Sequence, residues 1–153
     1  MNSTNTRRRG FSLVELVVCV AIIATVAGVG AARFSRSAER ARVESAARRV
    51  VSVLEDARTR ARTQGIRCKV AINVDTGLLE FKGTAASNAE LDVVNLGADP
   101  YRVQVISSNF NSEPDVEFNP WGRPVAGGTM LLGSGAFQRA VGVAAETGHA
   151  SLQ

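Results

Sequence analysis

A single carboxylate at the start of a long apolar run is the first feature of this sequence with the potential for chemistry. Glu15 lies within the segment 11–32, and residues 16–32 carry no charge. A carboxylate in such a run costs about 2–4 kcal/mol in lipid, so we expect Glu15 to have a cationic partner. Arginines at 7–9 and then Gly10 come directly before the run.

A helix must position this carboxylate. The segment 11–32 has 22 residues, which extend about 33 Å as a helix and exceed the roughly 30 Å of a bilayer core. We therefore predict a transmembrane helix over 11–32. Arginines flank both of its ends, so the positive-inside rule alone does not fix its orientation.

Residues 9–16 (RGFSLVEL) resemble the class III signal of type IV pilins and type II secretion pseudopilins. The resemblance implies that a prepilin peptidase removes residues 1–10 by cutting between Gly10 and Phe11, and that it N-methylates Phe11. It also implies that Glu15 is the assembly carboxylate. The leader is then cytoplasmic, and the rest of the chain beyond the inner membrane is a periplasmic head that later joins a fibre.

The chemistry of these residues agrees with the resemblance. Gly10 has no side chain, which suits close approach by a protease. The cut leaves a cationic amine on Phe11, one helical turn from Glu15. A pair between the amine and the carboxylate, within one chain or between neighbours, offsets the burial of Glu15 and sets the axial register between subunits.

Two other export signals also fit parts of this segment. A basic stretch followed by an apolar run is typical of a secretory signal, with a cut near 31–32, and residues 8–11 faintly resemble a twin-arginine signal. Either signal would release a soluble protein. Glu15 inside the apolar region argues against both.

The helix is predicted to continue over 33–64. Apolar residues there follow spacings of 4, 3, 4, 3 and 4, which is one helical stripe: Val43, Ala47, Val50, Leu54, Ala57 and Ala61. Gly65 is a helix terminator. The stripe fits a coiled coil equally well by periodicity, but the strand-rich sequence that follows favours packing on a sheet.

Residues 65–153 are predicted to form a head rich in β-strands. Alternating segments indicate strands at 67–74, 78–81, 91–96, 101–106, 116–118, 129–132 and 137–145, and residues 107–115 are predicted to be a loop. The expected fold class is α+β, a long N-terminal helix packed on a small antiparallel sheet.

The head is similar to the group that includes minor pseudopilin H and the FimT pilins. The similarity rests on residues 118–124 (FNPWGRP), a Gly-rich stretch, a strand pair and a terminal Thr-Gly turn. FimT-like proteins often carry a Gly-Arg-x-Arg element associated with DNA binding. Residues 148–151 here read GHAS, without either arginine, which counts against a DNA role.

Basic residues are concentrated in the middle of the chain. The 18 basic and 14 acidic residues become 15 and 14 once the three leader arginines are removed. Between 33 and 67, ten arginines face four acids, whereas five basic and nine acidic residues follow from 68 onward. We expect solvated or lipid-headgroup contacts, and the alternative is a DNA-binding surface formed by Arg58, Arg60, Arg62 and Arg67.

The residues give no sign of an enzyme, a metal site or a cofactor site. His149 is the one histidine, and no phosphate loop, metal-ligand spacing or nucleophile motif is present. Four acids match no calcium loop and are expected to be exposed: Asp92, Asp99, Glu113 and Asp115. Cys19 lies in the predicted membrane helix, and Cys68 is expected to be a small buried residue.

The resemblance thus implies a minor pilin-like structural subunit of a type II secretion pseudopilus, supporting protein secretion, or of a type IV pilus. The alternative is a DNA-binding minor pilin. The implied partners are other pilin or pseudopilin subunits, prepilin peptidase, the inner-membrane assembly platform and the lipid bilayer.

Overall fold

The computed structural model describes residues 12–83 and 93–153, and for residues 27–34 it describes the backbone alone. The chain divides into two compact units, Met1–Ser37 and Ala38–Gln153. Helix α1 (Leu13–Gln64) contributes residues to both units. The second unit contains all the strands and is called the head below.

Local interactions define both ends of helix α1. Leu16 N donates to Ser12 O at 3.2 Å, the first turn of the helix. Gly65 follows the last helical residue with φ of +65°, a left-handed conformation that ends helices and that glycine adopts at little cost. The helix therefore ends where Gly65 predicts.

The first sheet has the strand order β3-β2-β1-β5. Its centre is the predicted hairpin, in which β1 (Cys68–Asn73) and β2 (Leu78–Gly83) pair antiparallel in the register Ala71↔Glu80. At its edges lie β3 (Val93–Asn95) and β5 (Val116–Phe118). Residues 91 and 92 of the predicted third strand, with Asp92, lie outside the described residues.

The second sheet has the order β4-β6-β7-β8 and is also antiparallel. Its members are β4 (Gln104–Asn109), β6 (Gly128–Ser134), β7 (Phe137–Val143) and β8 (Ala150–Leu152). The β6–β7 hairpin turns at Gly135, which has φ of +58°. The last strand, β8, extends the sheet beyond the strands that the pattern predicted.

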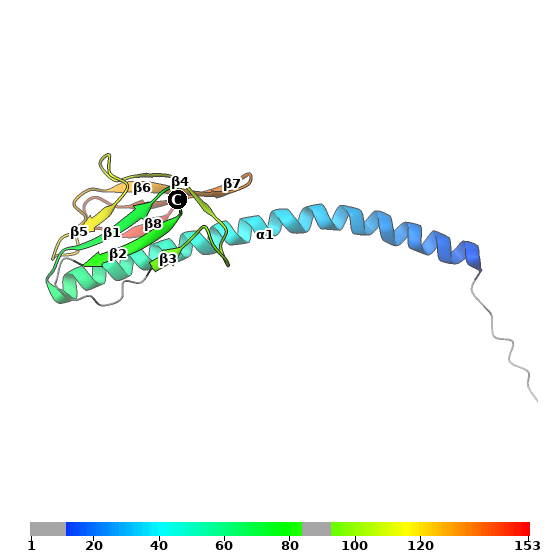
Figure 1. Cartoon of the computed structure of the whole chain (residues 1–153), viewed down its shortest axis with the longest axis horizontal. Coiled ribbons are helices and arrows are strands. Elements are labelled where there is room, and N and C mark those ends of the chain that lie inside the picture. Colours follow the sequence, from blue (N-terminus) through cyan, green and yellow to red (C-terminus); the bar gives the residue numbers. More distant parts are fainter. Residues whose placement is uncertain (1–11, 84–92) are drawn as a thin grey trace, which may run out of the picture. The chain divides into compact units, whose positions relative to one another are not determined.

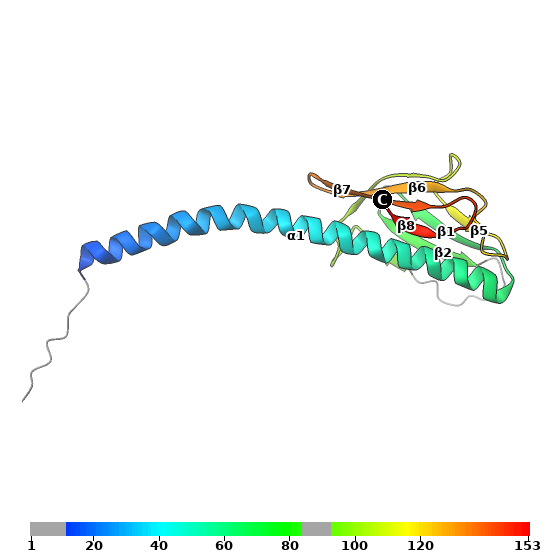
Figure 2. The same cartoon turned by 180° about the vertical axis from the view of Figure 1, so that it is seen from behind.

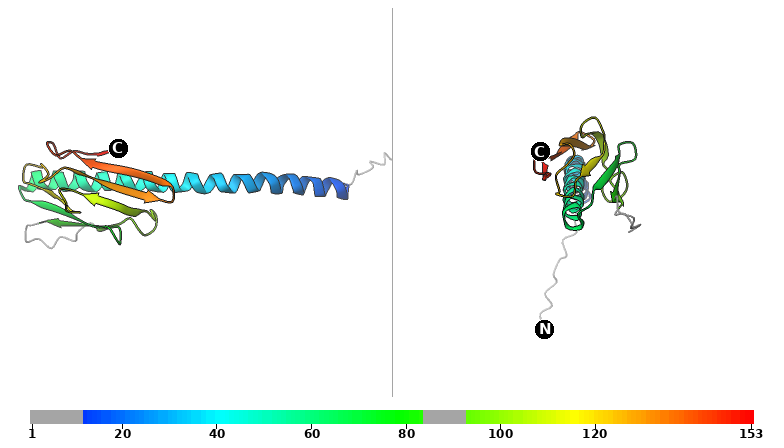
Figure 3. Two further views of the ribbon diagram at one scale, coloured as in Figure 1. Left: turned by 90° about the horizontal axis from the view of Figure 1, so that it is seen from above. Right: turned by 90° about the vertical axis from the view of Figure 1, so that its left-hand side faces the viewer.

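One hydrophobic core joins the two sheets to the head's part of α1. The predicted stripe is fully buried, with Val50, Leu54 and Ala57 at 0 % exposure. Both sheets lie beside this part of the helix (Figures 1 and 3). From behind, β8 lies between β7 and the helix (Figure 2). The stripe therefore packs on sheets, and the α+β fold with a helix on antiparallel strands is confirmed.

The fourth strand is displaced from its predicted position. Residues 101–106 were expected to be the strand, but Tyr101 N and Arg102 N both donate to Ala98 O, and Arg102 has φ of 51°. This turn delays β4 to Gln104. The strand then continues to Asn109 through a bulge between Val105 and Ser107, so the predicted loop at 107–115 is wrong over its first three residues.

Candidate assembly site

Glu15 lies in the first turn of α1, with its side chain exposed. An acid at this position also offsets the positive end of the helix dipole, so Glu15 favours the start of the helix apart from any assembly role. Gly10 and Phe11, the predicted cleavage pair, lie outside the described residues. The pairing of Glu15 with the Phe11 amine therefore stays a prediction.

Around Glu15 the helix presents an exposed apolar surface on every side. Nine large apolar side chains between Leu13 and Val26 are 51–78 % exposed. The Thr25 hydroxyl donates to Ile22 O at 2.8 Å, which satisfies a polar group that would otherwise be costly in an apolar setting. A helix that is apolar all round is typical of one that is buried by lipid or by other helices.

In the residues whose side chains the structure describes (12–26, 35–82 and 93–153), no helix contains an apolar stretch long enough to cross a membrane.

Three of the four arginines of the predicted DNA surface make charged or cation–π contacts within the head. Arg58 Nη1 pairs with Glu55 Oε2 at 3.1 Å, and Arg67 Nη1 pairs with Glu117 Oε1 at 3.2 Å. The guanidinium of Arg60 lies 4.9 Å from the centre of the Phe81 ring, a cation–π contact. Two of the four charges are therefore matched by carboxylates.

The C-terminal turn is fastened to α1 by one carboxylate. Glu55 Oε1 accepts a hydrogen bond from Ala150 N at 2.8 Å and lies 2.8 Å from His149 Nδ1. The lone histidine therefore contacts a structural carboxylate. Sequence patterns did not indicate this contact, because 95 residues separate Glu55 from Ala150.

Of the acids considered for calcium, Asp115 corrects the sequence expectation. It was expected to be exposed, but its side chain is 20 % exposed. It accepts from Ile72 N at 3.0 Å and pairs with Lys69 Nζ at 2.8 Å. Burial raises the pKa of Asp115, and the two donors outweigh burial, so its pKa lies below the ordinary value. Asp99 and Glu113 are exposed as expected.

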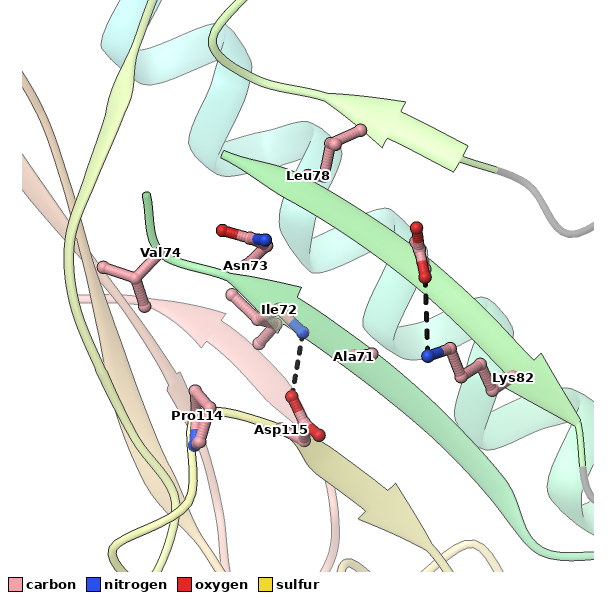
Figure 4. Close-up of a pocket in the computed structure, with 9 residues that line it drawn as sticks. Ala71, Ile72, Asn73, Val74, Leu78, Lys82, Pro114 and Asp115 are labelled. Atoms are coloured by element: carbon pink, nitrogen blue, oxygen red, sulfur yellow. Dashed lines mark hydrogen bonds and ion pairs between the residues drawn. The ribbon is translucent and has the colours of Figure 1, made fainter. Parts of the chain in front are cut away.

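Asp115 lies at the rim of a cleft of about 420 Å³ on the first sheet (Figure 4). Ile72, Val74 and Pro114 form much of its lining. Its charged lining residues are engaged, Glu80 with Lys82 at 3.5 Å and Asp115 with Lys69. The Asp115 carboxylate accepts from Ile72 N on the part of β1 that extends beyond its pairing with β5, which is a structural role.

The cysteines differ in exposure. Cys68 is fully buried as predicted, and burial raises the pKa of its thiol. Cys19 is exposed on the apolar part of α1. In the part of the chain that the structure describes, no three His, Cys, Asp or Glu side chains are grouped as metal ligands would be.

Comparison with known protein families identifies the family of this chain. A family profile described as "Type II transport protein GspH" matches residues 46–148, more than half of the chain. The chain belongs to the GspH family. A second profile, described as "Prokaryotic N-terminal methylation motif", matches residues 5–31 of this GspH protein. The second match spans Gly10, Phe11 and Glu15, whose individual roles stay predictions.

Solved structures share the fold of this GspH family member. The type IV minor pilin FimU of Pseudomonas aeruginosa matches in one crystal form with a TM-score of 0.55 and 20 % identity, over 75 % of this chain and 90 % of FimU. In a second form the TM-score is 0.51 and the identity 18 %, over 72 % and 91 %. A sequence search of curated proteins gives no significant match.

The predicted similarity to pilins and pseudopilins is therefore confirmed, and the GspH family member is a minor pilin-like structural subunit of a type II secretion pseudopilus or a type IV pilus. Its family is one of structural fibre components. Assembly with other subunits requires an exposed surface, and the start of α1 presents exposed apolar side chains from Leu13 to Val26.

Proposed function

We propose that this chain is a minor subunit of a type II secretion pseudopilus, stored in the inner membrane through the start of α1 and assembled by packing that helix against those of other subunits. The observation that carries the proposal is the set of nine exposed large apolar side chains between Leu13 and Val26 on α1. The match of the GspH profile to the head favours type II secretion over a type IV pilus.

The apolar surface explains why such a subunit needs two environments. Fully burying one large aliphatic side chain stabilises a protein or a complex by about 1.5–3 kcal/mol. Nine such side chains are exposed between Leu13 and Val26. Lipid covers them before assembly, and neighbouring helices cover them in the fibre. Transfer between two apolar environments costs little, so polar contacts decide when and in what register the subunit assembles.

Glu15 and the Phe11 amine provide those polar contacts. Peptidase cleavage after Gly10 creates the amine, and N-methylation keeps its charge. The unpaired carboxylate is costly in lipid, so an amine on a neighbouring subunit attracts it and fixes the axial offset between the two helices. In this arrangement the leader is cytoplasmic and the head is periplasmic, and the partners are the peptidase, the assembly platform and related subunits.

The test is the N-terminus of the mature protein. Mass spectrometry of the chain purified from cells with an active prepilin peptidase should show N-methyl-Phe11 as the first residue. Gly10→Val should keep the leader, because the added side chain blocks close approach at the cut. Ser12→Ala is the matched control and should be cut normally. A mature protein that begins at Met1, or near residue 33, would refute the proposal.

Deleting the gene separates the two machines. Loss of secretion of folded exoproteins with intact surface pili supports the pseudopilus, because the subunit then serves only secretion. Loss of surface pili and of twitching with normal secretion assigns the subunit to a type IV pilus instead. Complementation with the unaltered chain controls for effects of the deletion on neighbouring genes. Glu15→Ala should fail to complement, because it lacks the assembly carboxylate.

A further inference from the structure

Trp121, the one tryptophan of the chain, is strongly exposed. Its side chain is 77 % exposed, and Val125 nearby is 64 % exposed. Both belong to the connection between β5 and β6, which lies at the end of the head where α1 ends (Figure 1). Tryptophan offers a large apolar surface and is enriched among the residues that dominate protein interfaces, so its exposure on a folded head calls for an explanation.

The loop that presents Trp121 is fixed by its own hydrogen bonds. Asn119 Oδ1 accepts from Trp121 N and from Arg123 N, each at 3.0 Å. The backbone of Asn119 also donates to Arg123 O at 2.9 Å and accepts from Gly122 N at 2.8 Å. A loop that is already ordered loses little conformational entropy on binding.

The same loop is seated on α1 through Gly122. This glycine has φ of +76°, and a Cβ there would lie 2.5 Å from Arg62 Cγ and Cδ. Arg58 Nε donates to Gly122 O at 3.3 Å. On its other side, a Cβ on Gly148 would meet Gly122 O at 2.5 Å. The loop is therefore held between the last turns of α1 and the turn before β8.

Two guanidinium groups beside this loop are available. Arg62 and Arg123 are exposed, and within the described part of the chain neither has a carboxylate in ion-pair range. Arg58 and Arg67, by contrast, are matched by Glu55 and Glu117. The stem of Arg62 lies on Gly122, which stands between Trp121 and Arg123 in the chain. One loop therefore brings together an exposed indole and two exposed arginines that have no carboxylate partner among the described residues.

This combination favours a carboxylate over a nucleic acid. A polyanion is bound by a run of cations that neutralise successive phosphates, whereas here the neighbouring arginines are neutralised by acids. Guanidinium groups bind carboxylates with good geometry, and the indole covers an adjacent apolar group. We propose that Trp121, Arg62 and Arg123 form a docking surface for an acidic segment of a partner protein, with a carboxylate next to an aliphatic or aromatic side chain.

Because Trp121 is the only tryptophan, its fluorescence reports directly on this surface. The probe is an acetylated and amidated peptide, Glu-Phe-Asp-Leu-Glu, titrated into the full chain in detergent micelles. Its control is the uncharged peptide Gln-Phe-Asn-Leu-Gln. We expect the acidic peptide alone to shift the emission of Trp121, with an affinity that falls as salt is raised.

Substitutions then assign the binding to these residues. The double variant Arg62→Ala with Arg123→Ala should lower the affinity for the acidic peptide by at least about tenfold. It keeps Trp121, so the same fluorescence signal measures its binding. Arg42→Ala removes another exposed arginine of the same helix and should leave the affinity unchanged. A thermal melt of each variant confirms that the head is folded.

Three results would overturn the docking surface. One is the absence of an emission change at millimolar acidic peptide, and another is an equal response to the uncharged peptide. The third is tighter binding of a single-stranded oligothymidylate than of the acidic peptide, which would make the surface one for nucleic acid. None of these results bears on whether Phe11 is the mature first residue, so this inference and the proposed function fail independently.

Discussion

Glu55 Oε1 accepts a hydrogen bond from Ala150 N at 2.8 Å, which joins the middle of the head's helix to the last strand of the second sheet. The other oxygen of Glu55 pairs with Arg58, whose Nε in turn donates to Gly122 O at 3.3 Å. One side chain therefore connects α1, β8 and the loop after β5. We expect this junction to stabilise the C-terminal part of the head.

Replacing Glu55 with alanine should lower the free energy of unfolding of the head by about 1–3 kcal/mol, because Ala150 N–H and Arg58 lose their acceptor. Asp56→Ala is the matched control, since Asp56 is the exposed neighbour on the same helix, and it should stay within about 0.5 kcal/mol. Denaturant unfolding followed by Trp121 fluorescence measures both. Equal effects of the two variants would show that the junction carries no stability.

Gly148 and Gly65 allow a second matched comparison, because both have positive φ but different surroundings. A Cβ on Gly148 (φ +71°) would clash with Gly122 O, whereas one on Gly65 (φ +65°) meets nothing within 4 Å. Gly65→Ala should cost about 1–2 kcal/mol from backbone conformation. Gly148→Ala should cost clearly more, because the backbone of the loop must move. Thermal melts of the two variants measure these losses of stability. Equal losses would contradict the close packing of Gly148 against the loop that holds Gly122.

The pair between Asp115 and Lys69 predicts a sensitivity to acid. Burial raises the pKa of Asp115, but Lys69 and Ile72 N–H lower it below the ordinary value. The unfolded chain therefore takes up the proton first as pH falls, so the stabilisation is complete above the ordinary aspartate pKa and disappears as pH falls through the lowered one. Asp115→Asn should lose about 1–3 kcal/mol at neutral pH and less in acid.

Urea unfolding of the parent and of Asp115→Asn across a pH series tests this linkage. Asp99→Asn is the control, because Asp99 pairs with Arg102 at 2.7 Å but its side chain is 72 % exposed. Solvent screens such a pair, so this variant should unfold at nearly the parent's midpoint. A difference between the parent and Asp115→Asn that does not change with pH would contradict the role given to the Asp115 carboxylate.

The Cys68 thiol should be unreactive in the folded protein, because it is fully buried and burial raises its pKa. In a Cys19→Ser background, maleimide labelling should be slow until denaturant is added. Lys82→Cys, combined with Cys19→Ser and Cys68→Ser, places a thiol at an exposed position of the adjacent strand and should react at once. Rapid labelling of native Cys68 would mean that the first sheet opens readily.

Local patterns predicted those parts of the fold that depend on neighbours in sequence. The stripe from Val43 to Ala61 and the end of α1 before Gly65 follow from helix geometry, and the hairpin of β1 and β2 follows from strand alternation around a turn. These patterns could not predict that the strands divide into two sheets, because strand pairing joins residues that are far apart in the sequence. The polar residues Ser107 to Asn109 were predicted to be a loop because β4 has an exposed outer face and a bulge that breaks alternation.

The candidate site divides in the same way. Glu15 could be proposed from the sequence because a lone acid in an apolar run is conspicuous without knowledge of its partner, and its assembly role stays a prediction. Trp121 and the Glu55 junction were missed, because exposure and contacts across the head have no periodic signature. The nearest sequence signal was the turn formed by residues 119–124, which indicated a loop without indicating that its tryptophan is exposed.

The most direct test of the account compares how much Glu15→Ala and parent protein enter the fibre, relative to the amount in the membrane. Sheared fibres and membranes are quantified by immunoblot, with Glu39→Ala as a control for loss of an acid elsewhere on α1. We predict that Glu15→Ala is cut and membrane-bound like the parent but nearly absent from fibres, whereas Glu39→Ala is incorporated. Normal incorporation of Glu15→Ala would contradict the assembly role of this carboxylate.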